Sequence, residues 1–475
     1  MNAPLRKGEA ETRTGTLHLF ALFHLNLAFS SIEEEQRAEV IRRCYWPLLR
    51  LAETHGPIGL EATAYTLEEI ASRDPAWIEK ARALIASGRI ELIGSGYAQL
   101  IGPLVPAEVN EANLRIGNAL YESFFGVRPS LALVNEQAYS AGLVGLYLDA
   151  GYRALLMDWD NPAAHHPEWS AETRHLPQRA LGSDGRTIAL LWTNTVAFQK
   201  LQRFAHGDLP LGEYLDYVRA RRGAANRMLC LYASDAEIFD FRPGRYKTEE
   251  VCSDREWPRL GEAFAALAHE PGTTLIAPAE ALDVPAHGEA WQTLRLESAA
   301  CPVPVKKQRK YNLSRWAVTG RDDIAINAAC ERIYRGLMAR DAGDAAWKEL
   351  CYLWSSDFRT HITEKRWAGF CVRLAEAERE WSAAPPPRIA APDGAPLTER
   401  HIDIETPALT ARLDRRRGLA IERLHFAPHA RAAVGGLPHG HFDDIALQAD
   451  WYTGDCVFEA PGEHKLTDLE WCEAE

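Results

Sequence analysis

The sequence predicts an α/β protein whose main domain is an incomplete (β/α)7-type barrel, followed by a helical domain and a partial C-terminal β-domain. Over about the first 285 residues, short apolar runs alternate with longer amphipathic segments, a pattern that implies parallel strands joined by helical crossovers. The pattern becomes helical from about Arg321 and changes to short β-like runs after Pro385. Because 475 residues exceed one compact core, we expect three domains, spanning residues 1–285, 286–384 and 385–475.

The barrel strands are predicted from apolar runs, each bounded by turn-forming or polar residues. Seven or eight such strands are enough to close a barrel. No GxGxxG or GxxxxGK[ST] motif occurs, which disfavours a nucleotide-binding sheet. The predicted strands are Leu17–Phe23, Ile58–Ala62, Ile90–Gly94, Leu131–Asn135, Ala154–Asp158, Ile188–Trp192, Met228–Tyr232 and Thr274–Ala277, and the intervening helices include Ile32–His55, Pro75–Ser87, Pro106–Phe125, Ala141–Ala150 and Leu211–Arg222.

The remainder of the chain is predicted to be helical and then β-rich. The clearest helical patterns are Asp322–Ala339 and Thr363–Trp381, and the prolines from Pro385 to Pro387 are typical of a linker. Beyond them, alternating runs predict strands within His401–Leu413, Leu419–Phe426 and Ile445–Tyr452. We expect these runs to form an incomplete sandwich.

Composition limits the classes of partner. A formal net charge of -13 argues against binding to nucleic acid. The nine cysteines form no CxxC pair, so we expect reduced thiols and no zinc ribbon. Residues 1–16 lack the apolar core of a secretory signal, and no run reaches the ~20 apolar residues that cross a bilayer. We therefore expect a cytoplasmic protein with no membrane partner; the oligomeric state stays open.

Two apolar runs end abruptly on an acid, Leu131–Glu136 and Leu229–Asp235. Because side chains at the carboxyl ends of barrel strands converge on one face, Glu136 and Asp235 can meet there. Retaining cleavage of a glycosidic bond requires at least two carboxyl groups, about 5–5.5 Å apart. The alternatives are a helix cap for Glu136 and a solvated acidic loop for Asp235. Glu237 would point the same way as Asp235 and either raise its pKa or bind sugar hydroxyls.

Further candidates for sugar binding stand at other strand ends and on the predicted helices. His24 ends the first strand, where it would hydrogen-bond a sugar hydroxyl unless it is a satisfied core histidine. Trp159 and Asp160 close the fifth strand and offer a ring and an acid, with ordinary packing as the alternative. Trp354 and Asp357 are three residues apart, so on a helix they would share one face.

Five segments, taken in order, resemble the conserved regions of glycoside hydrolase family 57, which contains α-amylases, glucanotransferases, branching enzymes and α-galactosidases. The resemblance covers roughly residues 17–370. It implies Glu136 as nucleophile and Asp235 as acid/base, acting on an α-glycosidic bond of an oligo- or polysaccharide, with no cofactor. The segments are Phe23–Asn26, Gly88–Gln99, Leu133–Tyr139, Ser234–Phe239 and Leu353–Phe358, the last resembling the segment that closes the active site.

Two departures from that family concern positions that normally contact the sugar. Asn26 stands where the family carries a His, and Gln99 stands where it typically carries a Glu. Starch is therefore not assumed as the substrate, and we expect poor activity on long starch chains relative to some shorter or differently substituted α-glycoside. His24-Leu25-Asn26 also resembles the His-x-Asp of zinc-dependent α-mannosidases, but an amide is a weak zinc ligand, so we expect no metal. The alternatives are a metal-dependent mannosidase- or deacetylase-like enzyme and a non-catalytic carbohydrate-binding barrel.

Overall fold

The computed structural model describes residues 15–242, 255–284, 291–298, 301–305, 313–359, 362–382, 400–415, 419–427, 429, 432–433, 457–458 and 466–467. The chain divides into two compact units, residues 1–383 and residues 384–475. Each unit is described by itself.

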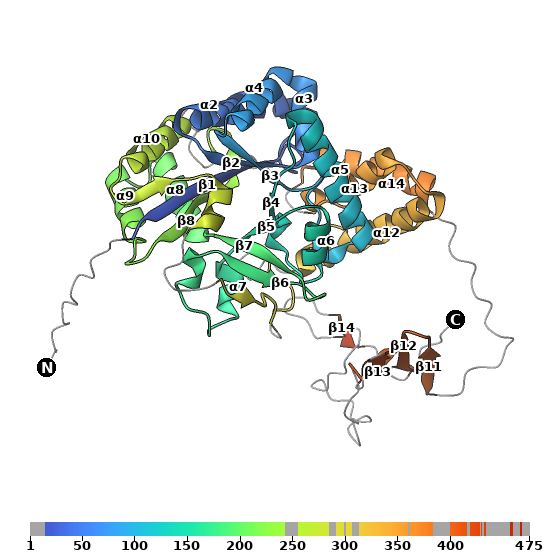
Figure 1. The fold of residues 1–475 in the computed structure, drawn as a ribbon. Coiled ribbons are helices and arrows are strands. Elements are labelled where there is room, and N and C mark those ends of the chain that lie inside the picture. The colour runs from blue at the N-terminus through green and yellow to red at the C-terminus, as the bar shows by residue number, and fades with distance from the viewer. Residues whose placement is uncertain are drawn as a thin grey trace. The chain divides into compact units, whose positions relative to one another are not determined.

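The first unit is built around one curled, ten-stranded sheet (Figure 1). Its strand order is β10-β6-β7-β5-β4-β3-β2-β1-β8, and β9 pairs with β1 beside this path. Seven of these strands, from β8 through β1–β5 to β7, form an unbroken parallel series, which confirms the predicted (β/α)7-type barrel. The strands are β1 (Leu17–Leu25), β2 (Ile58–Ala62), β3 (Ile90–Gly94), β4 (Leu131–Leu133), β5 (Ala154–Asp158), β6 (Gln178–Leu181), β7 (Thr187–Thr193), β8 (Arg227–Asp235), β9 (Thr273–Leu275) and β10 (Thr293–Leu294).

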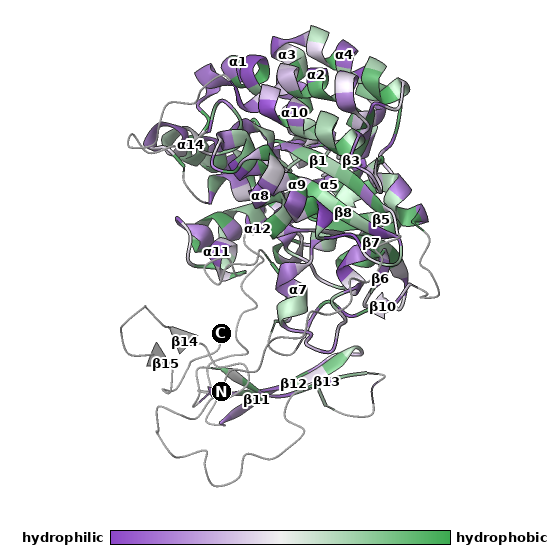
Figure 2. Ribbon diagram, turned by 90° about the vertical axis from the view of Figure 1, so that its left-hand side faces the viewer, coloured by the Kyte–Doolittle hydropathy of each residue, from purple (hydrophilic) through white to green (hydrophobic). Residues whose placement is uncertain are grey.

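Helices cover the sheet, as the crossover pattern requires. Figure 2 shows the central strands as mostly hydrophobic and the surrounding helices with hydrophilic faces. The strands are apolar along their length because both of their faces are buried, and every residue of β2 is buried. The helices are α1 (Arg37–Val40), α2 (Trp46–His55), α3 (Ala64–Arg73), α4 (Pro75–Ala86), α5 (Ala107–Phe125), α6 (Leu143–Asp149), α7 (Asp160–Ala164), α8 (Thr195–His206), α9 (Leu211–Arg219), α10 (Glu256–Ala268), α11 (Ser314–Ala317), α12 (Asp323–Arg340), α13 (Asp344–Leu353) and α14 (Glu364–Trp381).

Local sequence explains where several helices begin and end. Asp74 accepts a hydrogen bond from the backbone N–H of Trp77, and Pro75 occupies the first position of α4, a favourable N-terminus. Helix α5 ends where Gly126 adopts a left-handed conformation with φ 73°. These signals lie within one or two residues of the predicted boundaries.

The structure differs from the sequence-based expectations at several points, of which three lie in the barrel. The predicted helix Ile32–His55 is divided into α1, a π-helical turn at Ile41–Tyr45 and α2. The predicted strand Leu131–Asn135 ends at Leu133 because the chain turns sharply at Glu136. Strand β6 was not predicted, and it pairs antiparallel with β7 as a short hairpin.

Helices α11–α14 belong to the same compact unit as the barrel, so an independent domain over residues 286–384 stays a prediction. The helical part contacts the barrel through the backbone, because Leu100 forms a β-bridge with Ser355 and Ser356 N–H donates to Gln99 O at 2.8 Å. Arg366 reaches from α14 and donates to the carbonyl oxygens of Ala28 and Phe29. These contacts join the helical part to the loops that follow β1 and β3.

The second unit contains a small antiparallel sheet, β11-β12-β13, and a separate pair, β14-β15. The single run predicted over His401–Leu413 is a hairpin of two strands. Pro385–Pro387 and Ile445–Tyr452 lie outside the described residues. The strands are β11 (His401–Glu405), β12 (Leu409–Asp414), β13 (Ala420–Phe426), β14 (Val457–Phe458) and β15 (Leu466–Thr467).

In the part of the chain that the structure describes, none of the helices combines the length and the hydropathy that a membrane span requires.

Candidate active site

A cavity of about 150 Å³ opens at the carboxyl ends of β1, β4 and β8. Residues far apart in the sequence line it together, as expected for a barrel whose strand ends converge. Its lining includes six of the ten residues predicted for the site: His24, Asn26, Gln99, Glu136, Asp235 and Asp357.

Strand register places three charged residues side by side. His24 on β1 pairs in register with Glu61 on β2 and with Asp235 on β8. Residues in register on parallel strands lie at the same level of the sheet. His24 therefore lies between two acids, and its Nδ1 is hydrogen-bonded to Glu61 Oε2.

These acids determine the charge of His24. Burial of the ring lowers its pKa, but the charge and hydrogen bond of Glu61, together with the charges of Asp235 and Glu237, outweigh burial and raise the pKa of His24 to about 10. The imidazole is therefore positively charged at neutral pH. It places one fixed cation in a pocket otherwise rich in carboxyl groups.

Glu136 lies at a sharp turn directly after β4. Its backbone is left-handed, with φ 52° and ψ 14°, and Gln137 follows with φ 58°. This conformation is unfavourable for residues with a side chain and is found mostly where the surroundings enforce it. Here Asn135 accepts a hydrogen bond from Ser95 Oγ at 2.8 Å, and the side chain of Gln137 accepts one from Asp158 N–H at 2.7 Å.

The turn directs the half-buried Glu136 toward the cavity. Ser356 Oγ lies 3.3 Å from Glu136 Oε1 and donates a hydrogen bond to it. This hydrogen bond orients the carboxyl group of Glu136 in the cavity. Ser356 comes from the helical part of the unit, so both parts of the chain position Glu136.

Asp235 and Glu237 have different surroundings although they are two residues apart. Asp235 is exposed at the end of β8 and lines the cavity. Glu237 is buried below it, where its Oε1 accepts hydrogen bonds from Asn26 N–H at 2.7 Å and from the hydroxyl of Tyr45. Burial and the negative charge of Asp235 raise the pKa of Glu237 to about 7, against the opposing effect of His24.

Asn26, Gln99 and Asp357 form a hydrogen-bonded group on the wall of the cavity. Asn26 Nδ2 donates to Asp357 Oδ1 at 2.7 Å and to Gln99 Oε1 at 3.4 Å. The side-chain amide of Gln99 also lies 2.5 Å from His24 Nε2. Burial raises the pKa of Asp357, and the charge of Glu136 adds to this effect, while Asn26 and Arg366 oppose it. The two residues that depart from the family pattern thus contact each other.

Four predicted residues lie outside the cavity lining: Glu237, buried below Asp235, and three that lie elsewhere. Trp159 is 6% exposed and packs against Trp169 and Trp192, with ring centroids 5.6 and 5.1 Å apart. Asp160 begins α7, and its backbone N–H donates to Asp158 Oδ1. Trp354 is 4% exposed and donates to Asn327 Oδ1 at 2.9 Å. Helix α13 ends at Leu353, so the expectation that Trp354 and Asp357 share one helical face is wrong.

Sequence reasoning missed three residues that support the site: Glu61, Tyr45 and Ser356. Glu61 carries a signal, since it is the one charged residue in the buried strand Ile58–Ala62, and buried charges are rare unless paired. Ser356 lies in the segment Leu353–Phe358 that resembles a family region, but nothing distinguished it within that segment, and Tyr45 gave no signal. Their roles depend on contacts with residues about 220 and 190 positions away.

The donor set at His24 fits a metal ion poorly. Both of its ring nitrogens are engaged, Nδ1 by Glu61 and Nε2 by Gln99, and its neighbour Asn26 offers an amide. Over the described ranges, no cluster of three or more His, Cys, Asp or Glu side chains has a metal-binding arrangement. The absence of a cofactor stays a prediction.

The fold and the pocket place this chain among barrel proteins whose acidic side chains lie at the carboxyl ends of seven parallel strands. Residues 18–252 match the model of the family described as Glycosyl hydrolase family 57. The chain belongs to this family, as a divergent member.

Its similarity to individual relatives is low. It is 19% identical over 247 residues to an α-amylase of Pyrococcus furiosus, a match that spans 52% of this chain and 36% of the α-amylase. Among solved structures, it resembles the 4-α-glucanotransferase of Thermococcus litoralis, with a TM-score of 0.59, 15% identity and coverage of 87% of this chain and 67% of the other. It also resembles the branching enzyme of Pyrococcus horikoshii, with a TM-score of 0.55, 14% identity and coverage of 76% of this chain and 88% of the other. These likenesses concern the fold.

Proposed function

We propose that this protein is a retaining glycoside hydrolase or transglycosylase acting on α-glycosidic bonds, with Glu136 as nucleophile and Asp235 as acid/base. The observation that carries the proposal is that Glu136 and Asp235 line the same cavity, although 99 residues separate them in the sequence. Membership of family 57 supports it.

The proposed reaction has two steps. In the first, a carboxylate oxygen of Glu136 forms a bond to the anomeric carbon, the glycosidic C–O bond breaks, and the leaving oxygen takes the proton of Asp235. In the second, water or an acceptor hydroxyl gives a proton to Asp235 and attacks the anomeric carbon, which releases Glu136. Hydrolysis and transfer differ only in the attacking oxygen.

The charges around the cavity suit these roles. Ser356 donates a hydrogen bond to a carboxyl oxygen of Glu136, which orients the carboxyl group. The positive charge of His24 lies beside Asp235 in strand register, where it stabilises by its charge the conjugate base that the acid leaves. A charge that is in place before the substrate arrives needs no rearrangement during the reaction.

Asp235 is the better acid/base of the two neighbouring carboxyl groups. The pKa of Glu237 is raised to about 7, which suits a general acid. However, Glu237 is 2% exposed and its oxygen faces Asn26 and Tyr45, so it cannot reach a leaving group in the cavity. Because position must be satisfied before pKa, Asp235 takes the acid/base role, and Glu237 exchanges no proton with the sugar.

The substrate proposed is an oligo- or polysaccharide, and its sugar is set by the wall that contains Asn26 and Gln99. The named activities of the relatives concern an α-amylase, a 4-α-glucanotransferase and a branching enzyme. This chain spans only 36% of the length of the curated α-amylase, so its own substrate is a matter for experiment. A cytoplasmic location also stays a prediction.

The test uses Glu136→Gln and Asp235→Asn, which are nearly isosteric, with the exposed Glu122→Gln as matched control. Turnover of a panel of aryl α-glycosides and α-linked oligosaccharides should fall by about 10³-fold or more in both site variants and stay unchanged in the control. Circular dichroism should show an unchanged fold. The first-formed product should retain its anomeric configuration by NMR.

Three results would contradict the proposal. Inversion at the anomeric carbon would leave Glu136 with no role as nucleophile. Loss of wild-type activity on chelation, with recovery on adding zinc, would favour the metal-dependent mannosidase- or deacetylase-like alternative. Binding of oligosaccharides without any turnover across the panel would favour the non-catalytic alternative.

A further inference from the structure

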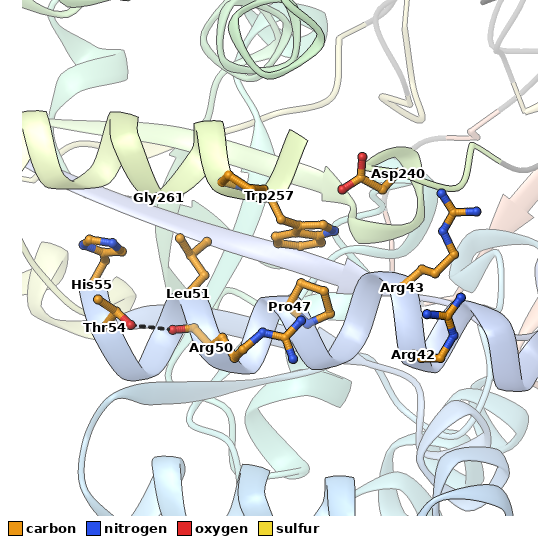
Figure 3. A pocket seen from close by; sticks show the side chains of 11 residues that line it. Arg42, Arg43, Pro47, Arg50, Leu51, Thr54, His55, Asp240, Trp257 and Gly261 are labelled. Carbon is orange, nitrogen blue, oxygen red and sulfur yellow. Dashed lines mark hydrogen bonds between the residues drawn. The ribbon is translucent and has the colours of Figure 1, made fainter. Parts of the chain in front are cut away.

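Two pockets of the first unit each contain an aromatic side chain, and the two rings differ in exposure. In a pocket of about 510 Å³ between α2 and α10, Trp257 is 7% exposed, and Figure 3 shows its indole ring lying over Pro47. The indole also pairs with the rings of Phe23 and Phe239, at centroid distances of 6.0 and 5.4 Å. Trp257 therefore belongs to the core.

Phe29 differs from Trp257, because it lies in the candidate active site. It is half-buried, packs against the core, and is the one Phe, Tyr or Trp among the described residues that line the cavity. Part of its side chain therefore faces the space that Glu136 and Asp235 also line. Aromatic side chains offer large, rigid apolar faces, and the C–H face of a pyranose ring is the apolar surface of a sugar. Phe29 thus suits the face of a sugar ring.

The turn that carries Phe29 has a fixed shape. Asn26 Oδ1 accepts a hydrogen bond from Ala28 N–H at 2.9 Å, and Leu27 N–H donates to Thr66 Oγ1 at 3.2 Å. A short amide side chain readily bonds the N–H two residues further on. Asn26, which departs from the family pattern, therefore also shapes the turn that carries Phe29. A contact that is held in place before the ligand arrives lowers the entropic cost of binding.

Arg366 on α14 holds the same turn from the helical part. The side chain is 8% exposed, and its guanidinium donates to Ala28 O at 2.9 Å and to Phe29 O. Two donors on one planar group fix the direction of both carbonyls, which a lysine ammonium does not reproduce. The charge of Arg366 also acts on Asp357, and a lysine in its place keeps that charge. Arg366→Lys therefore separates the geometry from the charge.

We propose that Phe29 is the aromatic contact of the sugar that occupies the cavity, and that Arg366 is a positioning residue that sets the place of the Phe29 ring. This inference rests on the function proposed above, because it takes the ligand of the cavity to be a sugar. Neither residue takes part in bond cleavage. Their contribution is therefore equal in the bound substrate and the transition state, and it acts on KM rather than on kcat.

Calorimetry on the full chain tests the contact in the Glu136→Gln background, where binding is measured without turnover. The probes are maltotriose, melibiose and an α-linked mannobiose, which present a glucoside, a galactoside and a mannoside. At least one probe should bind saturably, and Phe29→Ala should weaken that binding by about tenfold or more. Phe29→Tyr should bind within about twofold of its parent. Phe29→Leu, which is apolar but lacks a flat ring, should bind at least about threefold more weakly.

Phe124→Ala is the matched control, because Phe124 is another half-buried phenylalanine on the same core cluster and lies outside the cavity lining. It should leave binding unchanged. In the otherwise wild-type enzyme, Phe29→Ala should raise KM by about tenfold with kcat unchanged. Arg366→Lys should also weaken binding, but it should add nothing in a chain that already carries Phe29→Ala, because both changes act through one ring.

Failure of all three probes to bind, or equal binding by Phe29→Ala and its parent, would overturn the assignment of Phe29. Phe29→Leu keeps the packing against the core, so it tests the contact even where Phe29→Ala does not fold, and binding equal to that of its parent would overturn the role of the ring. Additive effects of Arg366→Lys and Phe29→Ala would overturn the positioning role.

The same measurements separate this inference from the proposed function. Binding that depends on Phe29, without turnover by the wild type, would contradict the proposed function alone. Turnover that needs Glu136 and Asp235 but is indifferent to Phe29→Ala would contradict this inference alone.

Discussion

His24 is the residue on which the charges of the candidate active site converge. Neither its position nor its charge is a property of the residue alone. Strand register puts Glu61 and Asp235 beside it, and Glu61 holds its Nδ1. The positive charge of His24 therefore depends on its position in the sheet. A sequence-based interpretation can identify the histidine at the strand end, but not the buried partner that keeps it charged.

Replacing Glu61 should show how much the pair of His24 and Glu61 contributes to the free energy of unfolding. The pKa of His24 is raised to about 10 in the folded state against 6.5 normally, so the stabilisation is fully present below pH 6.5 and is lost as the pH rises through 10. Glu61→Gln should lower the free energy of unfolding by about 3–5 kcal/mol near pH 6, because it leaves a buried ring without its counter-charge. The difference should shrink steadily toward pH 10, as measured by urea unfolding at several pH values.

The matched control for that measurement is Glu122→Gln, which breaks an exposed pair with Arg128 and should change stability by less than about 1 kcal/mol at every pH. A difference between wild type and Glu61→Gln that stays constant from pH 6 to pH 10 would show that His24 does not carry the charge.

Gln99 should set substrate preference. The side chain contacts both His24 and Asn26, and it donates and accepts where the family's carboxylate only accepts. We therefore expect the wild type to act poorly on soluble starch relative to some short α-linked glucoside, galactoside or mannoside. Gln99→Glu should shift the starch-to-oligosaccharide ratio of kcat/KM by about tenfold or more, since polar mismatches cost about 1–3 kcal/mol.

Gln99→Met, which removes both the donor and the acceptor, is the comparison that separates a specific effect from simple disruption. Starch as the clearly preferred substrate of the wild type would show that Asn26 and Gln99 are tolerated replacements, and the wall would then have no role in selecting the sugar.

At the scale of elements, α5 fixes the loop that carries Gln99. Asn113 on α5 accepts hydrogen bonds from Tyr97 N–H at 2.9 Å and Ala98 N–H at 2.8 Å, and its own side chain donates to Ala98 O. These hydrogen bonds require α5 to lie close to the loop. Gly117 permits this, because it has no side chain where α5 contacts the backbone of Gly96. A helical element thereby sets the position of a residue in the cavity wall.

Gly117→Ala should push this helix from the loop. A Cβ at Gly117 would lie 2.6 Å from the carbonyl carbon of Gly96, closer than packing allows. We expect a loss of about 1–3 kcal/mol in the free energy of unfolding and reduced kcat through displacement of Gln99. Gly369→Ala in α14 has open space around its Cβ and should stabilise by about 0.5–1 kcal/mol. Equal effects of both substitutions in thermal unfolding would contradict the proposed contact.

The elements themselves were largely predictable, because the barrel strands are apolar runs and their caps are local signals. Strands β2, β3 and β5 have the predicted bounds. Failures occurred where tertiary contacts override the local pattern. The turn at Glu136 shortens β4, and the π-helical turn interrupts the helix before α2. Both irregularities lie next to residues of the candidate site, and strain and unusual helix geometry are common at functional sites.

At the scale of the whole molecule, the site is built entirely by the first compact unit. Every residue that lines the cavity lies between positions 24 and 357. Convergence of strand ends made Glu136, Asp235 and His24 predictable, since these follow from the barrel alone. The contribution of Ser356 was not predictable in the same way, since it depends on how the helical part packs against the loop after β3.

Truncation tests whether the first unit is active without the second. A chain that ends at residue 382 keeps every residue lining the cavity and should retain activity within about twofold, with a melting temperature within a few degrees of the full chain, if units behave independently. A chain that ends at residue 341, before α13, lacks Ser356 and Asp357 and should lose activity by at least about 10²-fold. Full activity in the shorter chain would show that the helical part takes no part in the site.

The β-bridge between Leu100 and Ser355 also has a consequence for how the protein is made. Translation delivers the barrel strands first, and compact regions generally fold from the N-terminal side as they emerge. During that interval Asn26 and Glu136 lack the partners, Asp357 and Ser356, that the helical part later brings to them. The pocket is therefore complete only after the residues up to and beyond Asp357 have left the ribosome. Packing of the helical part against the barrel is then the last step in forming the site.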